Sequence, residues 1–379
     1  STFGSSEQRT AAVAQFNEIK PTVVAVMNES FTDLSCFEQL QAAGYFGPTF
    51  YNSLPDTLVR GTMLASVAGG GTANSEFEFL TGATTAFVGV GKIPYQLYQM
   101  SDVDSLAKDL KELGYTATAM HPQNPVNYHR DKIYQQLGFG DFLSIDDFEG
   151  ASYYHAGVCD YVTYDKILEL LRTNEAPQFI FDVTMQNHGG YEVGSVPAEE
   201  LTNYCVEGAS EGTNAMLNTY LTCINASDRD LEYFINELRN IGRPVVLVFF
   251  GDHQPSIAAA LNDELYPQED TASHAFRIHQ STYFVWANYE IAGNTELNVY
   301  DTVGANEIAA IALNKIGAPL TDYQKALLAT RSDVPTINVA GYLGADGLRY
   351  DLESEDSPYT STIDKLRRVQ YLEFATKVQ

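Results

Sequence analysis

A run of three glycines, Gly69 to Gly71, stands directly before the hydroxyl side chain of Thr72. Glycine has no Cβ atom, so the backbone there can approach a bound group closely. A threonine hydroxyl is a weak nucleophile at neutral pH, and coordination to a metal ion favours its alkoxide. The segment is no phosphate-binding P-loop, because the lysine of that pattern is missing. We predict that the glycines present Thr72 to a metal ion and an electrophile. The alternative is a plain turn that starts a helix.

Four apolar, β-prone segments each lead into a side chain that is ionisable or can bind a metal. Residues 22–27 are followed by Glu29, 116–120 by His121, 179–185 by His188, and 245–250 by Asp252 and His253. Ligands of open α/β sheets bind outside the carboxyl ends of the strands. We therefore expect these side chains to meet at one edge of a sheet.

Glu29, Asp252 and His253 offer two carboxylates and an imidazole, a ligand set suited to Mn²⁺, Zn²⁺ or Mg²⁺. Thr72 would supply a fourth contact to the metal ion. Each residue also has a structural interpretation. Glu29 could be an acid at a helix N-terminus, Asp252-His253 a turn, and His188 a loop cap. Their joint placement after separate strands favours the metal site.

The segment 121–142 gathers several cations in a very acidic chain. Arg130 can bind two phosphate oxygens at once, and Tyr128 offers a ring and a hydroxyl beside it. The alternative is a surface salt bridge of Arg130 with Asp131 or another carboxylate.

The elements that would position these residues alternate between strands and helices. Strand-like segments at 22–27, 116–120, 179–185, 245–250 and 282–287 are separated by amphipathic helical patterns at 104–114, 160–172 and 228–242. This order indicates an α/β fold with a mostly parallel sheet flanked by helices. Ser75 and Glu78 match a capping box, which predicts a helix that starts just after Thr72.

The pattern changes after a further helix at 305–317. Asp346-Gly347 stands between β-prone residues and predicts a hairpin, and a last helix is expected at 362–375. We predict a catalytic domain over residues 1–320 and a small antiparallel C-terminal subdomain over 321–379.

Composition limits the partners. The formal charge of −27 on 379 residues argues against nucleic acid and against electrostatic adhesion to an anionic membrane. No apolar run reaches the ~18–20 residues of a membrane helix, and the N-terminal segment lacks the pattern of a signal peptide. The four cysteines show no CxxC metal spacing. Either Cys205 and Cys223 form a disulfide across a polar segment, or all four cysteines are buried thiols.

Five segments together resemble the lipoteichoic acid synthase and phosphoglycerol transferase family, within the sulfatase and alkaline-phosphatase superfamily. They are NESF at 28–31, GGGTANSEFEFLTG at 69–82, HPQNPVNYHRD at 121–131, MQNHGGY at 185–191 and GDHQP at 251–255. They follow the family's order and cover most of the chain up to about residue 288.

The resemblance implies one Mn²⁺-like ion bound by Glu29, Thr72, Asp252 and His253, with Thr72 as the nucleophile. Arg130 and His188 would contact the glycerol-phosphate group, with Ser30, His121, Gln123 and Tyr128 nearby. The chain departs from lipoteichoic acid synthases at two positions: Tyr128 stands in place of a tryptophan, and Gln123 in place of an acid. These departures concern the donor head group and the acceptor more than the reaction.

The resemblance further implies transfer of glycerol phosphate from a phosphatidylglycerol-like lipid to a hydroxyl of a glycerol-phosphate polymer or a glycolipid. It implies an extracellular domain that follows membrane helices. The alternatives within the superfamily are a phosphoethanolamine transferase, a phosphodiesterase and a sulfatase. Cys36, in SCFEQL, does not match the convertible nucleophile of a sulfatase. A further alternative lies outside the enzymes: a non-catalytic envelope protein that binds glycerol-phosphate polymer.

Overall fold

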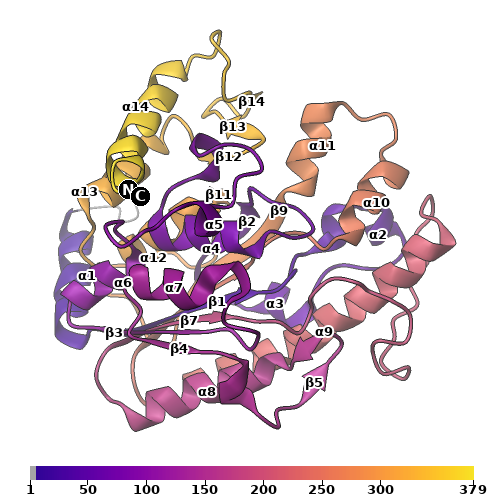
Figure 1. The fold of residues 1–379 in the computed structure, drawn as a ribbon, viewed down its shortest axis with the longest axis horizontal. Coiled ribbons are helices and arrows are strands. Elements are labelled where there is room, and N and C mark those ends of the chain that lie inside the picture. The colour runs from indigo at the N-terminus through magenta and orange to yellow at the C-terminus, as the bar shows by residue number, and fades with distance from the viewer. Residues whose placement is uncertain (1–5) are drawn as a thin grey trace.

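A mixed sheet forms the centre of the protein (Figure 1). The structure, a computed structural model, describes residues 6–379, and the first five residues of the N-terminal segment lie outside this range. The strand order is β10-β2-β9-β8-β1-β7-β3-β4, and β11 also pairs with β2. The bounds are β1 Thr22–Asn28, β2 Thr57–Leu64, β3 Thr116–Met120, β4 Asp141–Leu143, β7 Gln178–Val183, β8 Val245–Gly251, β9 Gln280–Ala287, β10 Val299–Tyr300 and β11 Val303–Gly304.

The half of the sheet that carries the predicted site residues is parallel. Strands β8, β1, β7, β3 and β4 all run in one direction, and β9 runs antiparallel to both β8 and β2. All five predicted strands are present with nearly the predicted bounds. The predicted α/β fold with a mostly parallel sheet is confirmed.

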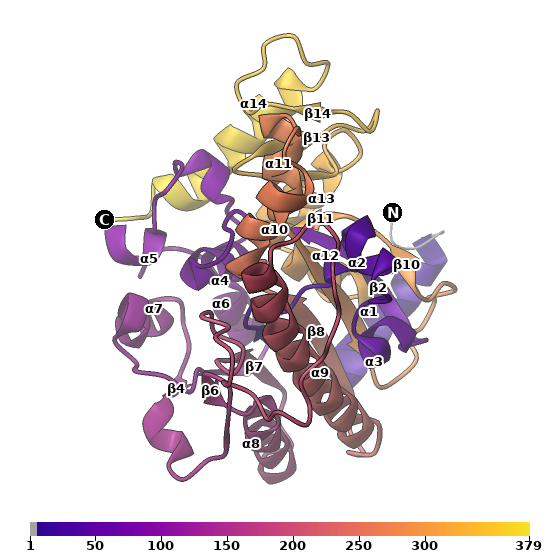
Figure 2. The same cartoon turned by 90° about the vertical axis from the view of Figure 1, so that its right-hand side faces the viewer.

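Helices cover both faces of the sheet (Figures 1 and 2). Residues of β1 alternate between two cores: Val23 and Ala25 pack with one, Val24 and Val26 with the other. This alternation follows from the period of two along a strand. The first core also contains residues of α1 Ser6–Ile19, α4 Thr72–Thr81, α6 Leu106–Glu112 and α12 Ile308–Lys315. The second contains residues of α3 Thr49–Ser53, α8 Asp160–Thr173, α9 Glu211–Arg239 and α10 Ile257–Leu265. The other helices are α2 Glu38–Ala42, α5 Pro94–Leu97, α7 Arg130–Gln136 and α11 Thr271–Ile278.

Several elements differ from the sequence prediction, among them the short strands β4, β10 and β11, which were not predicted. Strand β2 was not predicted; Arg60 and Gly61 interrupt its apolar residues, and it pairs antiparallel with β9. Helix α9 begins at Glu211 rather than near residue 228, because Ser210 accepts a hydrogen bond from the backbone N–H of Thr213 and caps the helix there.

The early start of α9 overturns the proposed disulfide. Cys223 lies buried inside the helix, and Cys205 is exposed before it. All four cysteines are free thiols. Cys36 is exposed like Cys205, so the alternative of four buried thiols is wrong for Cys36 and Cys205.

The C-terminal residues form a small separate sheet with its own apolar cluster. Strands β12 Thr336–Asn338, β13 Gly341–Leu343 and β14 Arg349–Tyr350 are antiparallel. The predicted hairpin joins β13 to β14, and Gly347 has the positive φ of +78° that this turn requires. Helices α13 Asp322–Thr330 and α14 Thr360–Gln370 accompany the sheet, and a π-helical turn continues α14 to Ala375. The domain boundary near residue 320 stays a prediction.

Candidate active site

The predicted meeting of side chains at one edge of the sheet is present. Glu29, His121, His188 and His253, which follow the four parallel strands β1, β3, β7 and β8, all line one cavity of about 660 Å³. Thr72 lines the same cavity. Its other lining residues are Gly69, Gly70, Gly71, Ile93, Gln96, Gln123, Asn127, Tyr128, Arg130, Met185, Gly189, Gly190 and Ser256.

Thr72 is the first residue of helix α4, and the glycines before it make this placement possible. Gly69 and Gly71 have φ of +70° and +84°, values that favour glycine. A Cβ atom on Gly71 would lie 2.9 Å from the side chain of Val67. The helix does start at Thr72, as predicted.

The predicted capping box of this helix is wrong. Gly71 is the N-cap residue and makes no side-chain hydrogen bond. Ser75 Oγ instead donates to the backbone carbonyl of Asp252, 2.6 Å away, and ties α4 to the end of β8. Glu78 accepts hydrogen bonds from Ser66 and Thr85.

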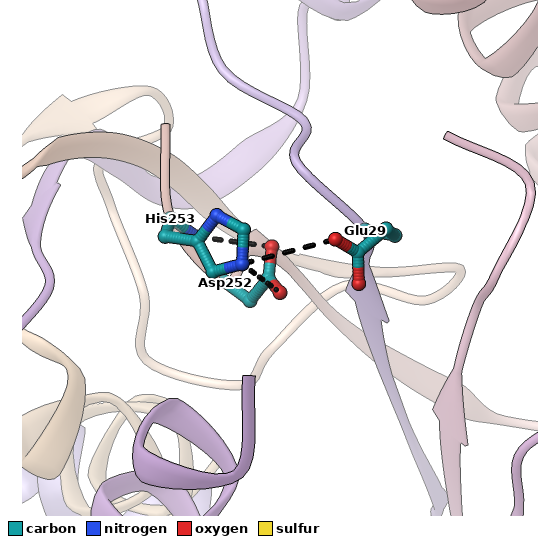
Figure 3. Close-up of side chains that lie close together, drawn as sticks. All are labelled: Glu29, Asp252 and His253. Carbon is teal, nitrogen blue, oxygen red and sulfur yellow. Dashed lines mark hydrogen bonds and ion pairs between the residues drawn. The ribbon is translucent and has the colours of Figure 1, made fainter. Parts of the chain in front are cut away.

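The hydroxyl of Thr72 lies among the three predicted metal ligands. Its Oγ1 is 2.8 Å from Asp252 Oδ2, 3.3 Å from Glu29 Oε2 and 3.4 Å from His253 Nε2. His253 Nε2 lies 3.0 Å from Asp252 Oδ2 and 3.7 Å from Glu29 Oε1 (Figure 3). All four side chains are buried. The sequence thus assembles two carboxylates, an imidazole and a hydroxyl from three distant segments.

Burial and the neighbouring charges change the pKa values of this cluster. Burial and the charge of Asp252 raise the pKa of Glu29 to about 8. Burial alone would lower the pKa of His253, but the carboxylates of Asp252 and Glu29 raise it to about 9. Burial would raise the pKa of Asp252, yet the adjacent imidazolium of His253 holds it below its ordinary value. At neutral pH, Glu29 and His253 therefore each hold a proton.

This cluster is suited to a divalent cation. Ligand atoms of Glu29, Asp252 and His253 all lie within 4.8 Å of one another. Oxygen and nitrogen donors of this kind bind Mn²⁺, Zn²⁺ or Mg²⁺. A cation at this position would displace the protons of Glu29 and His253 and balance two buried carboxylates.

Ser30 contacts the cluster but is not among the residues that line the cavity. Its backbone N–H donates to Asp252 Oδ1 at 2.7 Å, and its Oγ donates to Glu29 Oε1 at 3.0 Å. The positive φ of Ser30, 53°, turns the backbone so that both bonds form. Ser30 therefore orients two ligands in this structure.

Arg130 is buried in the wall of the cavity, and it forms a buried salt bridge with another carboxylate, Glu76, rather than a surface salt bridge with Asp131. Its Nη2 lies 2.6 Å from Glu76 Oε2, and its Nε donates to the same carboxylate. The hydroxyl of Tyr134 also donates to Glu76. The guanidinium lies 5.2 Å from the ring centre of Tyr128, within the range of a cation–π contact. The sequence prediction did not include Glu76, although a glutamate one helical turn after Thr72 in an apolar segment was a visible signal.

The other two histidines of the cavity, His121 and His188, differ in their surroundings. His121 is buried, and its Nδ1 lies 2.8 Å from the carbonyl oxygen of Val183. A carbonyl only accepts, so Nδ1 carries the proton and Nε2 has a free lone pair. Burial and the charge of Arg130 hold the pKa of His121 well below its ordinary value. His188 is exposed at the cavity.

A family comparison agrees with this geometry. Residues 21–310 match the sulfatase family model. The chain belongs to the sulfatase family. This match covers all three segments of the cluster and confirms the prediction of an enzyme of this superfamily.

Two relatives of this sulfatase-family chain are named for cyclic beta-1,2-glucan modification and for likeness to a lipoteichoic acid synthase. A protein named for cyclic beta-1,2-glucan modification from Rhizobium meliloti (strain 1021) is 29% identical over 276 residues, covering 71% of this chain and 42% of the relative. The lipoteichoic acid synthase-like YvgJ of Bacillus subtilis (strain 168) is 26% identical over 198 residues, covering 51% of this chain and 29% of the relative. The chain thus spans less than half the length of these curated relatives.

Solved structures show the same fold. The phosphoglycerol transferase GacH of Streptococcus pyogenes, in complex with sn-glycerol-1-phosphate, matches with a TM-score of 0.73 at 22% identity, over 97% of this chain and 91% of GacH. The lipoteichoic acid synthase LtaP of Listeria monocytogenes matches with a TM-score of 0.64 at 16% identity, over 94% of this chain and 91% of LtaP. The periplasmic domain of EcEptC from Escherichia coli, in complex with Zn, has a TM-score of 0.56 at 14% identity over 78% of this chain and 82% of EcEptC.

Proposed function

We propose that this sulfatase-family domain is a metal-dependent phosphoglycerol transferase that works through a phosphothreonine at Thr72. The observation that carries the proposal is the position of the Thr72 hydroxyl, which lies within 3.4 Å of a ligand atom of Glu29, Asp252 and His253 and at the wall of a cavity. The names of GacH, LtaP and YvgJ support glycerol phosphate as the transferred group.

Glu29, Thr72, Asp252 and His253 would hold one divalent cation, with Mn²⁺ proposed and Mg²⁺ or Zn²⁺ as alternatives. When bound, such a cation lowers the pKa of a coordinated hydroxyl and stabilises negative charge on phosphoryl oxygens. Ser30 keeps the carboxylates of Glu29 and Asp252 in place for this role.

In the first half-reaction, Thr72 Oγ attacks the phosphorus of a phosphatidylglycerol-like donor. A P–O bond forms to Thr72, whose hydroxyl proton passes to solvent, while the P–O bond to diacylglycerol breaks. The product is Thr72 esterified with glycerol phosphate, which is the phosphothreonine of this proposal. His188 protonates or orients the departing oxygen. Arg130 stabilises the charge on the equatorial oxygens, which is most of what phosphoryl transfer requires of a protein.

In the second half-reaction, an acceptor hydroxyl attacks the phosphothreonine. A new P–O bond forms to the acceptor, whose hydroxyl proton passes to His188, while the bond to Thr72 Oγ breaks and the threonine takes a proton from solvent. His121 Nε2 has a lone pair that can accept a hydrogen bond from a substrate hydroxyl. Gln123 and Tyr128 line the same cavity and would contact the head group or the acceptor. We propose a glycerol-phosphate polymer or a glycolipid sugar as this acceptor.

The surroundings of the domain follow from the same proposal. The donor is a membrane lipid, so we propose an extracellular domain tethered to the cell membrane. Within residues 6–379, no helix is both long and apolar enough to cross a membrane. Cys36 lines a different cavity from Thr72, which argues against a sulfatase with a cysteine nucleophile.

The test is to incubate the purified domain with Mn²⁺ and radiolabelled phosphatidylglycerol and to look for labelled phosphothreonine by mass spectrometry. We expect Thr72→Ala to lose about 10³-fold or more of the activity, since the nucleophile is removed. Thr81→Ala, at the other end of α4, removes a hydroxyl that bonds only within the helix and the next turn, and should stay active. Normal turnover by a folded Thr72→Ala variant would refute the proposal.

The same assay separates the alternatives. Label transferred from phosphatidylethanolamine but not from phosphatidylglycerol would indicate a phosphoethanolamine transferase. Release of free glycerol phosphate in the presence of every acceptor would indicate a phosphodiesterase. Binding of glycerol-phosphate polymer without any phosphothreonine would indicate a non-catalytic protein.

A further inference from the structure

Glu76 is a buried carboxylate that the reaction above does not use. It lies on α4, four residues after Thr72, and its side chain is fully buried. Because residues four apart lie on the same face of a helix, about 6 Å apart along its axis, Thr72 and Glu76 project to the same side of α4. One rigid element thus carries both the nucleophile and the group that holds Arg130.

The guanidinium of Arg130 has an inner edge, Nε and Nη2, which contacts Glu76, and an outer edge, which carries Nη1. Nε and Nη2 face Glu76, at 3.1 Å and 2.6 Å from Oε2. A guanidinium has five N–H donors in a fixed plane. Among residues 6–379, Nη1 donates no hydrogen bond to a carboxylate or a backbone carbonyl, while the Tyr134 hydroxyl also interacts with the guanidinium; Arg130 lines the cavity. An anion can therefore bind at this outer edge without displacing Glu76.

Two further side chains complete the support. The hydroxyl of Tyr134, also on α7, donates to the other oxygen of Glu76. The ring of Tyr128 lies against the guanidinium. Glu76 accepts hydrogen bonds from two residues of α7, Arg130 and Tyr134. It therefore fixes the start of that helix against α4 as well as the direction of Arg130.

We propose that Glu76 is a positioning residue, which sets the outer edge of the Arg130 guanidinium at a fixed distance from the Thr72 hydroxyl and aims it at the phosphoryl oxygens. This inference rests on the proposed function for the role of Arg130. It requires that the pair with Glu76 persists when a phosphate group binds.

The first test is structural and needs no turnover. Crystals of the protein are soaked with inorganic phosphate and Mn²⁺. We expect a phosphate oxygen on Nη1 of Arg130 with the Glu76 pair still in place. In Glu76→Gln, we expect the guanidinium to leave this position. A phosphate that displaces Glu76 from Arg130 in the unmodified protein would overturn the proposal, and so would an unmoved guanidinium in Glu76→Gln.

The second test is kinetic and uses two probes, phosphatidylglycerol and the generic phosphodiester bis(p-nitrophenyl) phosphate. A misplacement of about 1 Å costs roughly a hundredfold in rate, so we expect this loss in the single-turnover rate constant of Glu76→Gln, larger than any rise in KM. The burst amplitude of phosphothreonine should stay near that of the unmodified protein, because the site is intact. Loss of burst amplitude with an unchanged rate constant would show a merely structural role and overturn the inference.

Glu78→Gln is the matched control. Glu78 is buried on the same helix and bonds Ser66 and Thr85 instead of Arg130, so its loss disturbs α4 without touching the pair. We expect Glu78→Gln to keep its rate constant. Should Glu76→Gln not fold, Tyr134→Phe removes one bond to Glu76 and is expected to show a smaller loss of rate. Activity on the generic phosphodiester without activity on phosphatidylglycerol would refute the proposed function while still testing Glu76.

Discussion

The binding of a cation to the Thr72 cluster should depend steeply on pH. Without a cation, Glu29 and His253 hold protons because their pKa values are raised to about 8 and about 9. A metal ligand must lose its proton to bind, so each proton competes with the cation. Below a ligand's pKa, every pH unit costs about a factor of ten in apparent affinity.

The two groups together give the magnitude. Between pH 6 and pH 8 His253 stays mostly protonated, and its competition falls about a hundredfold over this range. Glu29 contributes somewhat less, since its pKa of about 8 lies at the end of the range. The apparent affinity for Mn²⁺ should therefore rise by about 10³-fold or more, and binding at pH 6.5 should release about two protons.

Isothermal titration calorimetry in buffers of different ionisation enthalpy measures both quantities. Glu29→Gln removes one titrating ligand, so we expect about one released proton and a shallower pH dependence. Glu78→Gln is the control: the pKa of this buried carboxyl is also raised, to about 7, but it does not touch the cluster. An affinity that stays constant from pH 6 to pH 8 would refute the assignment of the cluster as the cation site.

Three further predictions concern stability and the position of Thr72. With a chelator present, the free energy of unfolding should fall as the pH rises toward about 8 and then about 9. The reason is that Glu29 and His253 bind protons more tightly in the folded state than in the unfolded chain. Urea melts at pH 6.5 and pH 9.5 should show this loss of stability, and added Mn²⁺ should remove it. Gly71→Ala should lower the free energy of unfolding, followed in a thermal melt, by about 1–2 kcal/mol, because φ is +84° at this position and the new methyl group meets Val67. The substitution should also slow phosphothreonine formation. A variant with unchanged stability and rate would contradict this prediction. Phe374→Ala should cost about 3–5 kcal/mol in urea, since its ring packs on Phe77 of α4; an unchanged midpoint would show that this C-terminal contact contributes nothing.

The long strands β1, β7 and β8 of the parallel half could be predicted from the sequence because they are nearly continuous apolar runs, whereas the three-residue strand β4 could not. Val245 to Phe250 and Phe179 to Val183 are buried on both faces, so their residues show a strong signal. Strand β2 was missed because Arg60 and Gly61 stand in its middle; the guanidinium of Arg60 is held by backbone carbonyls of residues 51 and 54, a solution that only the tertiary structure reveals.

The candidate site was predicted for a related reason. Residues that directly follow buried strands are fixed in space by the sheet, so Glu29, Asp252 and His253 could be placed together without a structure. Residues whose role is to hold another side chain in place could not be predicted in this way. The role of Ser30 depends on its unusual backbone angle, and that of Glu76 depends on a contact with a residue 54 positions away along the chain.

Every residue of helix α4 is buried, although it begins at the wall of an open cavity. Such a helix cannot shift or fray at its start without opening the hydrophobic core, so the Thr72 hydroxyl is held by one of the most rigid parts of the molecule. Gln96, Gln123 and Asn127, by contrast, line the cavity from short or irregular segments outside this helix. Substitution of these carboxamides should therefore change the cavity wall while the position of the Thr72 hydroxyl stays unchanged.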